Sequence, residues 1–261
     1  MSANNLSNSG KKMLEIEVKN VSKSFTDGTD VLRNLSFEVK EGEFVCLLGP
    51  SGCGKTTLIM CIAGIEPTSS GEILLTGKKV KGPGPERSVV FQNFALFPWL
   101  SVSKNVSFGL EIARKERQEI DEIVQKVLRL VGLSGFENSY PNELSGGMRQ
   151  RVGIARALAV DPKIMLMDEP FGALDALTRN VLERETIRIW KETGKTILFV
   201  TQNIDEAIML ADRIYLFSAR PATIKKAFEP EYEQPRVYSR HPDLLDLRNN
   251  IILLFKEELR D

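Results

Sequence analysis

The sequence has no long apolar run. No stretch approaches the roughly 18 residues that a membrane-spanning helix needs, and the polar beginning, MSANNLSNSGKK, lacks the apolar core of a secretory signal. We expect residues 1–12 to form a disordered tail. If the protein works at a membrane, another subunit must hold it there.

An excess of charge and a cysteine framework are also missing. Lys plus Arg and Asp plus Glu number 35 each, so charge alone does not indicate a nucleic-acid binder. The three cysteines, Cys46, Cys53 and Cys61, have no CxxC spacing, which argues against a disulfide framework and a zinc site. Reduced thiols in a reducing compartment are the simplest interpretation. Histidine occurs once, at His241.

What the chain does have is strands that alternate with helices, which predicts an α/β fold around a parallel sheet. Half-buried antiparallel strands are expected at 14–18 and from residue 31. Buried strands are expected at 43–49, 163–168 and 196–201, with 213–219 closing the sheet. Helices are expected at 55–64 and 175–190. A helical block over about 103–159 looks inserted between two core strands.

The composition shifts after Arg220. PEYEQPR fits no regular element, and the final segment is amphipathic. Its apolar side is formed by Leu244, Leu247, Ile251, Leu254 and Phe255. A C-terminal helix docked on the core explains this pattern; a regulatory or partner-binding segment is the alternative.

GPSGCGKTT fits the phosphate-binding pattern G-x-x-x-x-G-K-[ST] and lies between a buried strand and the start of a helix. Its glycines allow backbone N–H groups to turn toward an anion, and the helix N-terminus adds its positive dipole end. Lys55 is predicted to reach the β- and γ-phosphates, and the Thr56 hydroxyl to bind Mg²⁺. A glycine-rich turn without a ligand is the alternative. The predicted ATP-binding residues are Gly49, Pro50, Ser51, Gly52, Cys53, Gly54, Lys55, Thr56 and Thr57.

IMLMDEP supplies acidic groups at the end of another buried strand. Asp168 is placed to hold Mg²⁺ directly or through water, and Glu169 to polarise an attacking water. Otherwise the two acids only cap the following helix.

LSGGMRQRVGIARAL contains a second glycine-rich helix start, at Ser145. Such a helix start can also bind phosphate. A second anion site is redundant in one chain, but not if two chains meet head to tail and each turn closes over the other's γ-phosphate.

Together, GPSGCGKTT, LSGGMRQ and LMDEP resemble the nucleotide-binding subunits of ABC transporters, over about residues 13–219. The resemblance implies a P-loop NTPase (RecA-like) core, with an antiparallel β subdomain and an inserted helical subdomain at about 93–160. Residues 220–261 would then be a C-terminal extension.

The resemblance also implies roles for particular residues. Phe25 would stack on adenine, Gln92 would sense Mg²⁺ and the attacking water, and Asp175 would lie at the dimer seam. The signature loop that binds ATP in trans would comprise Ser145, Gly146, Gly147 and Met148, with Met148 where glutamine is commoner.

Gln202 stands at the end of the 196–201 strand, where such ATPases usually carry a histidine. Glutamine can donate a hydrogen bond to the γ-phosphate but cannot titrate. We expect slowed but real hydrolysis, driven by Glu169; a core amide without a catalytic part is the alternative. Asn203 and Glu206 predict a helix N-cap with a capping box.

The sequence therefore predicts an ATP- and Mg²⁺-dependent ATPase subunit of an importer, most similar to the nitrate, sulfonate and taurine group through PWLSVSKNVSFGL and SARPATI. Expected partners are a second ATPase subunit in a homodimer, membrane permeases and, indirectly, a solute-binding protein, but no nucleic acid. The expected location is the cytoplasmic face of the membrane. Phe97 to Leu100 would dock the permease or pack in the core. The alternatives are a soluble ABC ATPase, and a nucleotide-gated scaffold or near-inactive half of an unequal pair.

Overall fold

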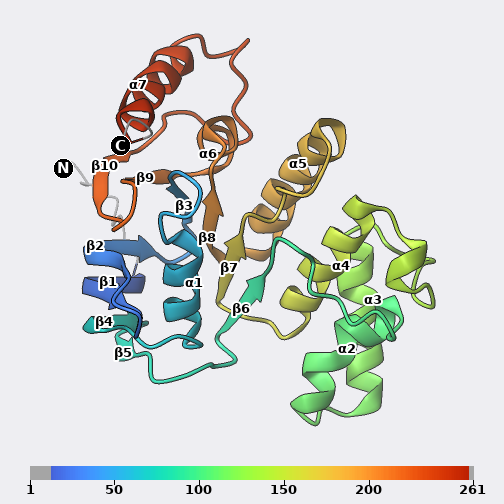
Figure 1. Ribbon diagram of the computed structural model, residues 1–261. Coiled ribbons are helices and arrows are strands. Elements are labelled where there is room, and N and C mark those ends of the chain that lie inside the picture. The colour runs from blue at the N-terminus through green and yellow to red at the C-terminus, as the bar shows by residue number, and fades with distance from the viewer. Residues whose placement is uncertain (1–12, 259–261) are drawn as a thin grey trace, which may run out of the picture.

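The computed structural model describes residues 13–258 and contains two β-sheets with a helix between them (Figure 1). The smaller sheet is antiparallel, as predicted for its first two strands, and has the order β2-β1-β4-β5. Every second residue of β2 from Val31 to Val39 tends to be buried, which is the pattern of a sheet with one wet face. The strands are β1 (Leu14–Ser24), β2 (Asp30–Lys40), β4 (Ser70–Leu75) and β5 (Lys78–Lys79).

The larger sheet has six strands in the order β10-β9-β3-β8-β7-β6. All neighbouring pairs from β9 to β6 are parallel, as predicted, and only β10 runs antiparallel. The expectation that 213–219 closes the sheet is wrong, because the chain turns after Ser218 and adds β10 at the edge. The strands are β3 (Phe44–Leu48), β6 (Arg87–Val90), β7 (Ile164–Asp168), β8 (Thr196–Thr201), β9 (Arg213–Phe217) and β10 (Ile224–Phe228).

Helix α1 (Lys55–Ala63) lies between the two sheets (Figure 1). The buried residues form two clusters, one on each face of the larger sheet, and strand β3 contributes to both. Its residues alternate, so that Val45 and Leu47 pack toward α1 and the small sheet, whereas Phe44 and Leu48 pack toward the helices on the opposite face. Because both faces are covered, all five residues of β3 are buried. The loop at its carboxyl end is thereby held on a rigid base.

The predicted helical block between β6 and β7 is present as α2 (Val102–Ile112), α3 (Arg117–Leu130), a short 3₁₀ turn (Pro141–Glu143) and α4 (Gly146–Ala159). On α3, Ile120 and Val127 are buried and Ile123 is partly buried. This block lies to one side of the sheet, beyond β6 (Figure 1).

The remaining helices are α5 (Ala176–Thr193), α6 (Ile204–Leu210) and α7 (Leu244–Glu257). Leu244 and Ile251 of α7 are buried, and Leu247, Leu254 and Phe255 pack partly buried against the core. The interpretation of the last segment as a docked helix is thus confirmed. The predicted tail, 1–12, lies outside the described residues. Within the described range, no helix combines the length and apolarity needed to cross a bilayer.

Candidate functional site

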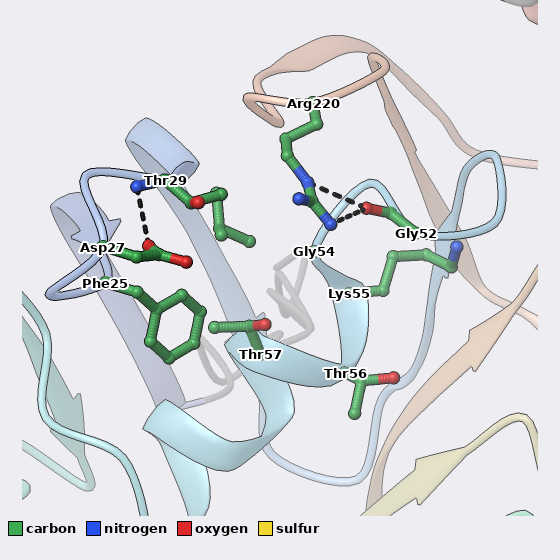
Figure 2. A pocket seen from close by; sticks show the side chains of 10 residues that line it. Phe25, Asp27, Thr29, Gly52, Gly54, Lys55, Thr56, Thr57 and Arg220 are labelled. Atoms are coloured by element: carbon green, nitrogen blue, oxygen red, sulfur yellow. Dashed lines mark hydrogen bonds between the residues drawn. The ribbon is translucent and has the colours of Figure 1, made fainter.

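A pocket of ≈ 300 Å³ opens beside the N-terminus of α1 (Figure 2). Of the residues predicted to bind nucleotide, Phe25, Gly52, Gly54, Lys55, Thr56 and Thr57 line it. The loop after β1, the P-loop and the start of α1 therefore converge. Sequence reasoning missed four further lining residues, Asp27, Thr29, Val31 and Arg220. For Arg220 the available signal is its place in SARPATI, the segment that carries the resemblance to the importer group.

The P-loop backbone requires glycine at Gly54, the residue that precedes α1. Its φ is 121°, and a Cβ there would lie 2.7 Å from Val31 Cγ1. No acidic side chain occurs in the first turn of α1, so the N–H groups at this end keep their positive field. Cys53 is buried and burial raises the pKa of its thiol. Cys53, although predicted to bind ATP, does not line the pocket.

Lys55 is 3% exposed. Its Nζ donates hydrogen bonds to the Gly49 carbonyl at 2.9 Å and the Pro50 carbonyl at 2.7 Å. The ammonium group is thus held against the P-loop by two carbonyl groups. An anion that enters the loop can replace these carbonyl groups as its hydrogen-bond acceptor.

Thr56, in the first turn of α1, meets Asp168, the last residue of β7. The Thr56 hydroxyl donates to Asp168 Oδ1 at 3.0 Å. Burial raises the pKa of Asp168, and the hydrogen bond from Thr56 and the charge of Lys55 oppose this rise. A hydroxyl and a carboxylate placed together are oxygen ligands of the kind that Mg²⁺ prefers, so the residues present fit this ion.

Glu169 follows Asp168 in an unusual conformation, with φ at 42°. Its N–H donates to the Val200 carbonyl at 3.0 Å, which keeps the chain beside β8 after β7 ends. Burial raises the pKa of the Glu169 carboxyl; Lys55 opposes the rise and Asp168 adds to it. A raised pKa makes this carboxylate a better proton acceptor.

Gln202 faces Glu169. Its Nε2 lies 3.4 Å from Glu169 Oε2, at the limit of a weak hydrogen bond. The Gln202 amide is therefore beside Glu169, the predicted base. Its N–H group is a donor of the kind that can hydrogen-bond to a phosphate.

The helix start after Gln202 is only partly as predicted. Asn203 is the N-cap of α6 and its Oδ1 accepts from the N–H groups of Asp205 and Glu206. The capping box is wrong, because the Glu206 carboxylate does not reach back to Asn203. It instead accepts a hydrogen bond from the Thr201 hydroxyl at 2.5 Å, and Thr201 Oγ1 accepts from the Asn203 N–H.

Gln92 lies against the turn that follows Glu169. A Cβ added to Gly172 would lie 2.9 Å from Gln92 Nε2, so the amide end of Gln92 lies against this glycine. Gln92 is exposed and is placed at the side of the site nearest the helical block.

The predicted signature turn is a helix cap in this chain. Ser145 is the N-cap of α4 and its Oγ accepts from the Met148 N–H at 3.2 Å, while Met148 itself is partly buried against the core. A Cβ at Gly147 would lie 2.6 Å from Thr178 Cγ2, so α4 approaches α5 closely. Asp175 caps α5 by accepting from two backbone N–H groups. Helix α4 lies well apart from α1 (Figure 1), and none of these residues lines the pocket.

The aromatic residues after Gln92 form a partly exposed group. Phe97 packs against Phe108 with ring centroids 4.5 Å apart and against Trp99 at 5.8 Å. Trp99 is 70% exposed. Asn105 holds the loop by accepting from the Phe97 N–H and donating to nearby carbonyl groups. Phe97 thus has packing partners, whereas Trp99 is presented to solvent.

Comparison with known families agrees with this geometry: a family model described as ABC transporter matches residues 32–172. The chain belongs to the ABC transporter family. The match spans the P-loop, the signature turn and the Asp168–Glu169 pair, and the chain is an ATP-binding subunit with ATPase activity.

Relatives cover most of the chain. The uncharacterised ABC transporter ATP-binding protein MJ0412 of Methanocaldococcus jannaschii is 49% identical over 94% of this chain and 93% of its own length. The taurine import ATP-binding protein TauB of Escherichia coli is 49% identical over 76% of this chain and 77% of its own. A dimeric, post-hydrolysis structure of the ATP-binding cassette MJ0796, bound to ADP and Pi, superposes with a TM-score of 0.73 at 31% identity. It covers 84% of this chain and 100% of that chain.

Proposed function

We propose that this ABC ATPase is the ATP-hydrolysing subunit of an importer of the nitrate, sulfonate and taurine group, and that it drives membrane permeases by ATP-dependent dimer closure. The observation that carries the proposal is that the chain has two separate glycine-rich helix N-termini, one lining the pocket at α1 and one at α4 outside it. The similarity to TauB supports the direction of transport.

Within the pocket, Phe25 would stack on the adenine and the P-loop N–H groups would hold the phosphates. Thr56, Asp168 and Gln92 would hold Mg²⁺. When bound, the ion neutralises charge on the β- and γ-phosphates. Glu169 would accept a proton from the attacking water, and its raised pKa favours this role.

Gln202 would orient Glu169 and donate to the γ-phosphate, in place of the family's histidine. The 3.4 Å approach of its amide to Glu169 supports a catalytic position. Because glutamine does not titrate, it can supply geometry and a hydrogen bond but no proton transfer. We therefore infer hydrolysis that is slowed but retained.

A second copy would complete the site. The turn Ser145, Gly146, Gly147 and Met148 forms the N-terminus of α4, with Ser145 exposed, and none of these residues lines the chain's own pocket. Placed over the γ-phosphate of the other copy, this end would add N–H donors that are available only in the closed dimer. ATP would then favour closure because it binds that state better. Asp175 would lie at the seam.

The group Phe97, Trp99 and Phe108 would dock the permease. An exposed tryptophan on a packed aromatic base suits the centre of an interface, and its position next to Gln92 would link docking to the site. The subunit would then sit on the cytoplasmic face of the membrane, held by the permease. A solute-binding protein would be an indirect partner.

ATP turnover by the purified protein, alone and then with co-expressed permease, tests the proposal. We expect turnover that depends on Mg²⁺, rises more than linearly with protein concentration, and increases with the correct permease. Turnover strictly proportional to concentration, from a species that stays monomeric with ATP, would contradict the head-to-tail site.

The presence of Gln202 supports one other function, that of a nucleotide-gated scaffold or the near-inactive half of an unequal pair. This alternative predicts ATP-dependent dimerisation without measurable turnover by the chain alone. Restoration of turnover by a second, different ATPase subunit would favour it.

A further inference from the structure

The loop between β9 and β10 reaches the nucleotide pocket from the opposite side to Phe25 (Figure 2). Arg220, at the tip of this loop, is exposed, and its Nε and Nη2 both donate to the Gly52 carbonyl, at 3.3 and 3.1 Å. Gly52 belongs to the P-loop itself. A cation from a separate part of the chain is therefore fixed on the rim of the phosphate-binding loop.

The backbone of this loop is held firmly. The Ala222 N–H donates to the Val31 carbonyl at 2.8 Å and the Arg33 N–H donates to the Ala222 carbonyl at 3.0 Å, which joins the loop to β2. Strand β2 is also the strand that lies against Gly54 through Val31. Arg220 is thus built into the same scaffold that shapes the P-loop.

The end of helix α7 supports the loop from behind. The Ala219 N–H, one residue before Arg220, donates to Glu258 Oε2 at 2.8 Å, and Glu258 Oε1 pairs with Lys225 Nζ at 2.6 Å. Because α7 is docked on the core through Leu244 and Ile251, the C-terminal extension sets the position of Arg220.

We propose that Arg220 is a nucleotide-binding residue that contacts the phosphate chain, and that Glu258 is its positioning residue. A guanidinium group has five N–H donors, and the two bonds to Gly52 use only part of them. The remaining donors face a pocket that also contains Lys55 and Thr57. Arginine suits a phosphate because its planar donors match two oxygen atoms at once.

The location of Asp27 is consistent with this assignment. Asp27 lines the same pocket and accepts from the Thr29 N–H at 2.9 Å. It carries the opposite charge to Arg220 and lies beside Phe25 (Figure 2). Arg220 is thus on the P-loop side of the pocket, whereas Asp27 is on the Phe25 side, where Lys23 Nζ also lies 4.9 Å from the Phe25 ring centroid.

The test is binding of a fluorescent ADP to the full chain, because ADP binding needs neither hydrolysis nor a dimer. Arg220→Gln removes the charge, Arg220→Lys keeps it, and Arg240→Gln makes the same charge change at an exposed site elsewhere in the extension. We expect Arg220→Gln to weaken ADP binding about tenfold, the effect of losing one charge-assisted hydrogen bond. Arg220→Lys should lose less, and Arg240→Gln should bind as the wild type does.

Salt dependence separates contact with the phosphate from support of the P-loop. A lost ion contact makes ADP binding less sensitive to salt, so Arg220→Gln should show a shallower slope of log Kd against log salt concentration than the wild type. Affinity within twofold of the wild type, or a loss of affinity with an unchanged slope, would overturn the phosphate contact.

Glu258→Ala tests the positioning role in two backgrounds. It should weaken ADP binding about two- to threefold in the wild type and not at all in the Arg220→Gln variant, because residues that act through one contact are not additive. An equal effect in both backgrounds would show that Glu258 does not act through Arg220.

Discussion

The P-loop pocket and the signature turn differ in how many of their polar side chains already have partners from distant segments of the same chain. Beside the P-loop, residues from distant segments already touch: Thr56, which lines the pocket, reaches Asp168 at 3.0 Å, and next to Asp168 Gln202 reaches Glu169 at 3.4 Å. At the signature turn, Ser145 satisfies only its own helix. Both are helix N-termini able to bind an anion, yet only at the first is a hydroxyl of the helix hydrogen-bonded to a carboxylate from a distant strand.

This difference indicates a division of labour. ATP hydrolysis requires catalytic groups that are positioned to within fractions of an ångström. The parallel sheet positions them because it brings the carboxyl ends of β3, β7 and β8 together. Sensing whether a second copy has arrived requires a surface that is incomplete alone. Under the proposed function the exposed Ser145 end would be this surface, and the following predictions test the division.

The largest effect is expected for Glu169→Gln. Without a proton acceptor, turnover should fall by about 10² to 10⁴, while ATP is still bound and holds a closed dimer. Turnover and light scattering with ATP measure both effects, and Glu192→Gln, an exposed carboxylate on α5, is the control. Wild-type turnover in the Glu169 variant would show that another group is the base. The contrast between a catalytic P-loop region and a non-catalytic signature turn would then lose its support.

Ser145→Arg tests the signature turn. The long charged side chain should block the seam, so that ATP no longer induces a dimer and turnover drops at least about tenfold, whereas ADP binds normally. Loss of the N-cap should also lower stability by about 1 kcal/mol, which thermal unfolding measures. Ser134→Arg adds the same group at an exposed position of the helical block. A parallel loss of ADP affinity in Ser145→Arg would mean that the two regions are not separate.

Gln202→His sharpens the description of the pocket. Histidine at this position would keep a donor near Glu169 and add a titratable group, so turnover should rise severalfold. Gln202→Ala, which removes the amide, should lower it. Steady-state ATPase rates at equal dimer content decide the matter; an unchanged or reduced rate in the histidine variant would show that glutamine is no handicap here.

The smallest effect on activity is expected from Glu183 on α5, which is 3% exposed and whose Oε2 has no hydrogen-bond partner among the described residues. Burial, reinforced by Glu206 and opposed by Arg179, raises the pKa of Glu183 to about 7. The unfolded chain ionises this group near the ordinary value of 4.5. The stability that the neutral form provides is therefore complete below pH 4.5 and is lost as the pH rises to about 7.

Glu183→Gln should remove this loss. The variant should be more stable than the wild type at pH 8, by at most about 3 kcal/mol, and the gain should shrink toward pH 5. Thermal unfolding at several pH values measures this, with Glu192→Gln as the matched exposed carboxylate. A gain that does not depend on pH would mean that ionisation of Glu183 is not its cause.

Motifs with local causes were predictable from sequence. The buried strand before Gly49, the helix from Lys55, the cap at Asn203 and the apolar face of α7 all rest on residues that interact with near neighbours in the chain. The resemblance to ABC ATPases then supplied roles for Gln92, Ser145 and Gln202, whose function depends on groups that are far away in sequence.

Other features were not predictable in this way. The Glu206 carboxylate was expected to accept from the Asn203 N–H in a capping box. It accepts from the buried Thr201 hydroxyl instead, because a buried carboxylate needs a hydrogen-bond donor. Strand β10 went unnoticed because its middle residues, Lys225, Lys226 and Ala227, are exposed and do not have the pattern of a core strand.

The sequence by itself determined the ABC cassette, its P-loop and the residues at the strand ends, because these depend on local backbone geometry and on apolar periodicity. Only the tertiary structure decided that Gln202 faces Glu169, that Ser145 does not line its own pocket, and that Arg220 rests on Gly52. Those relations join segments up to 168 positions apart, and only the packing of two sheets around α1 fixes such distances.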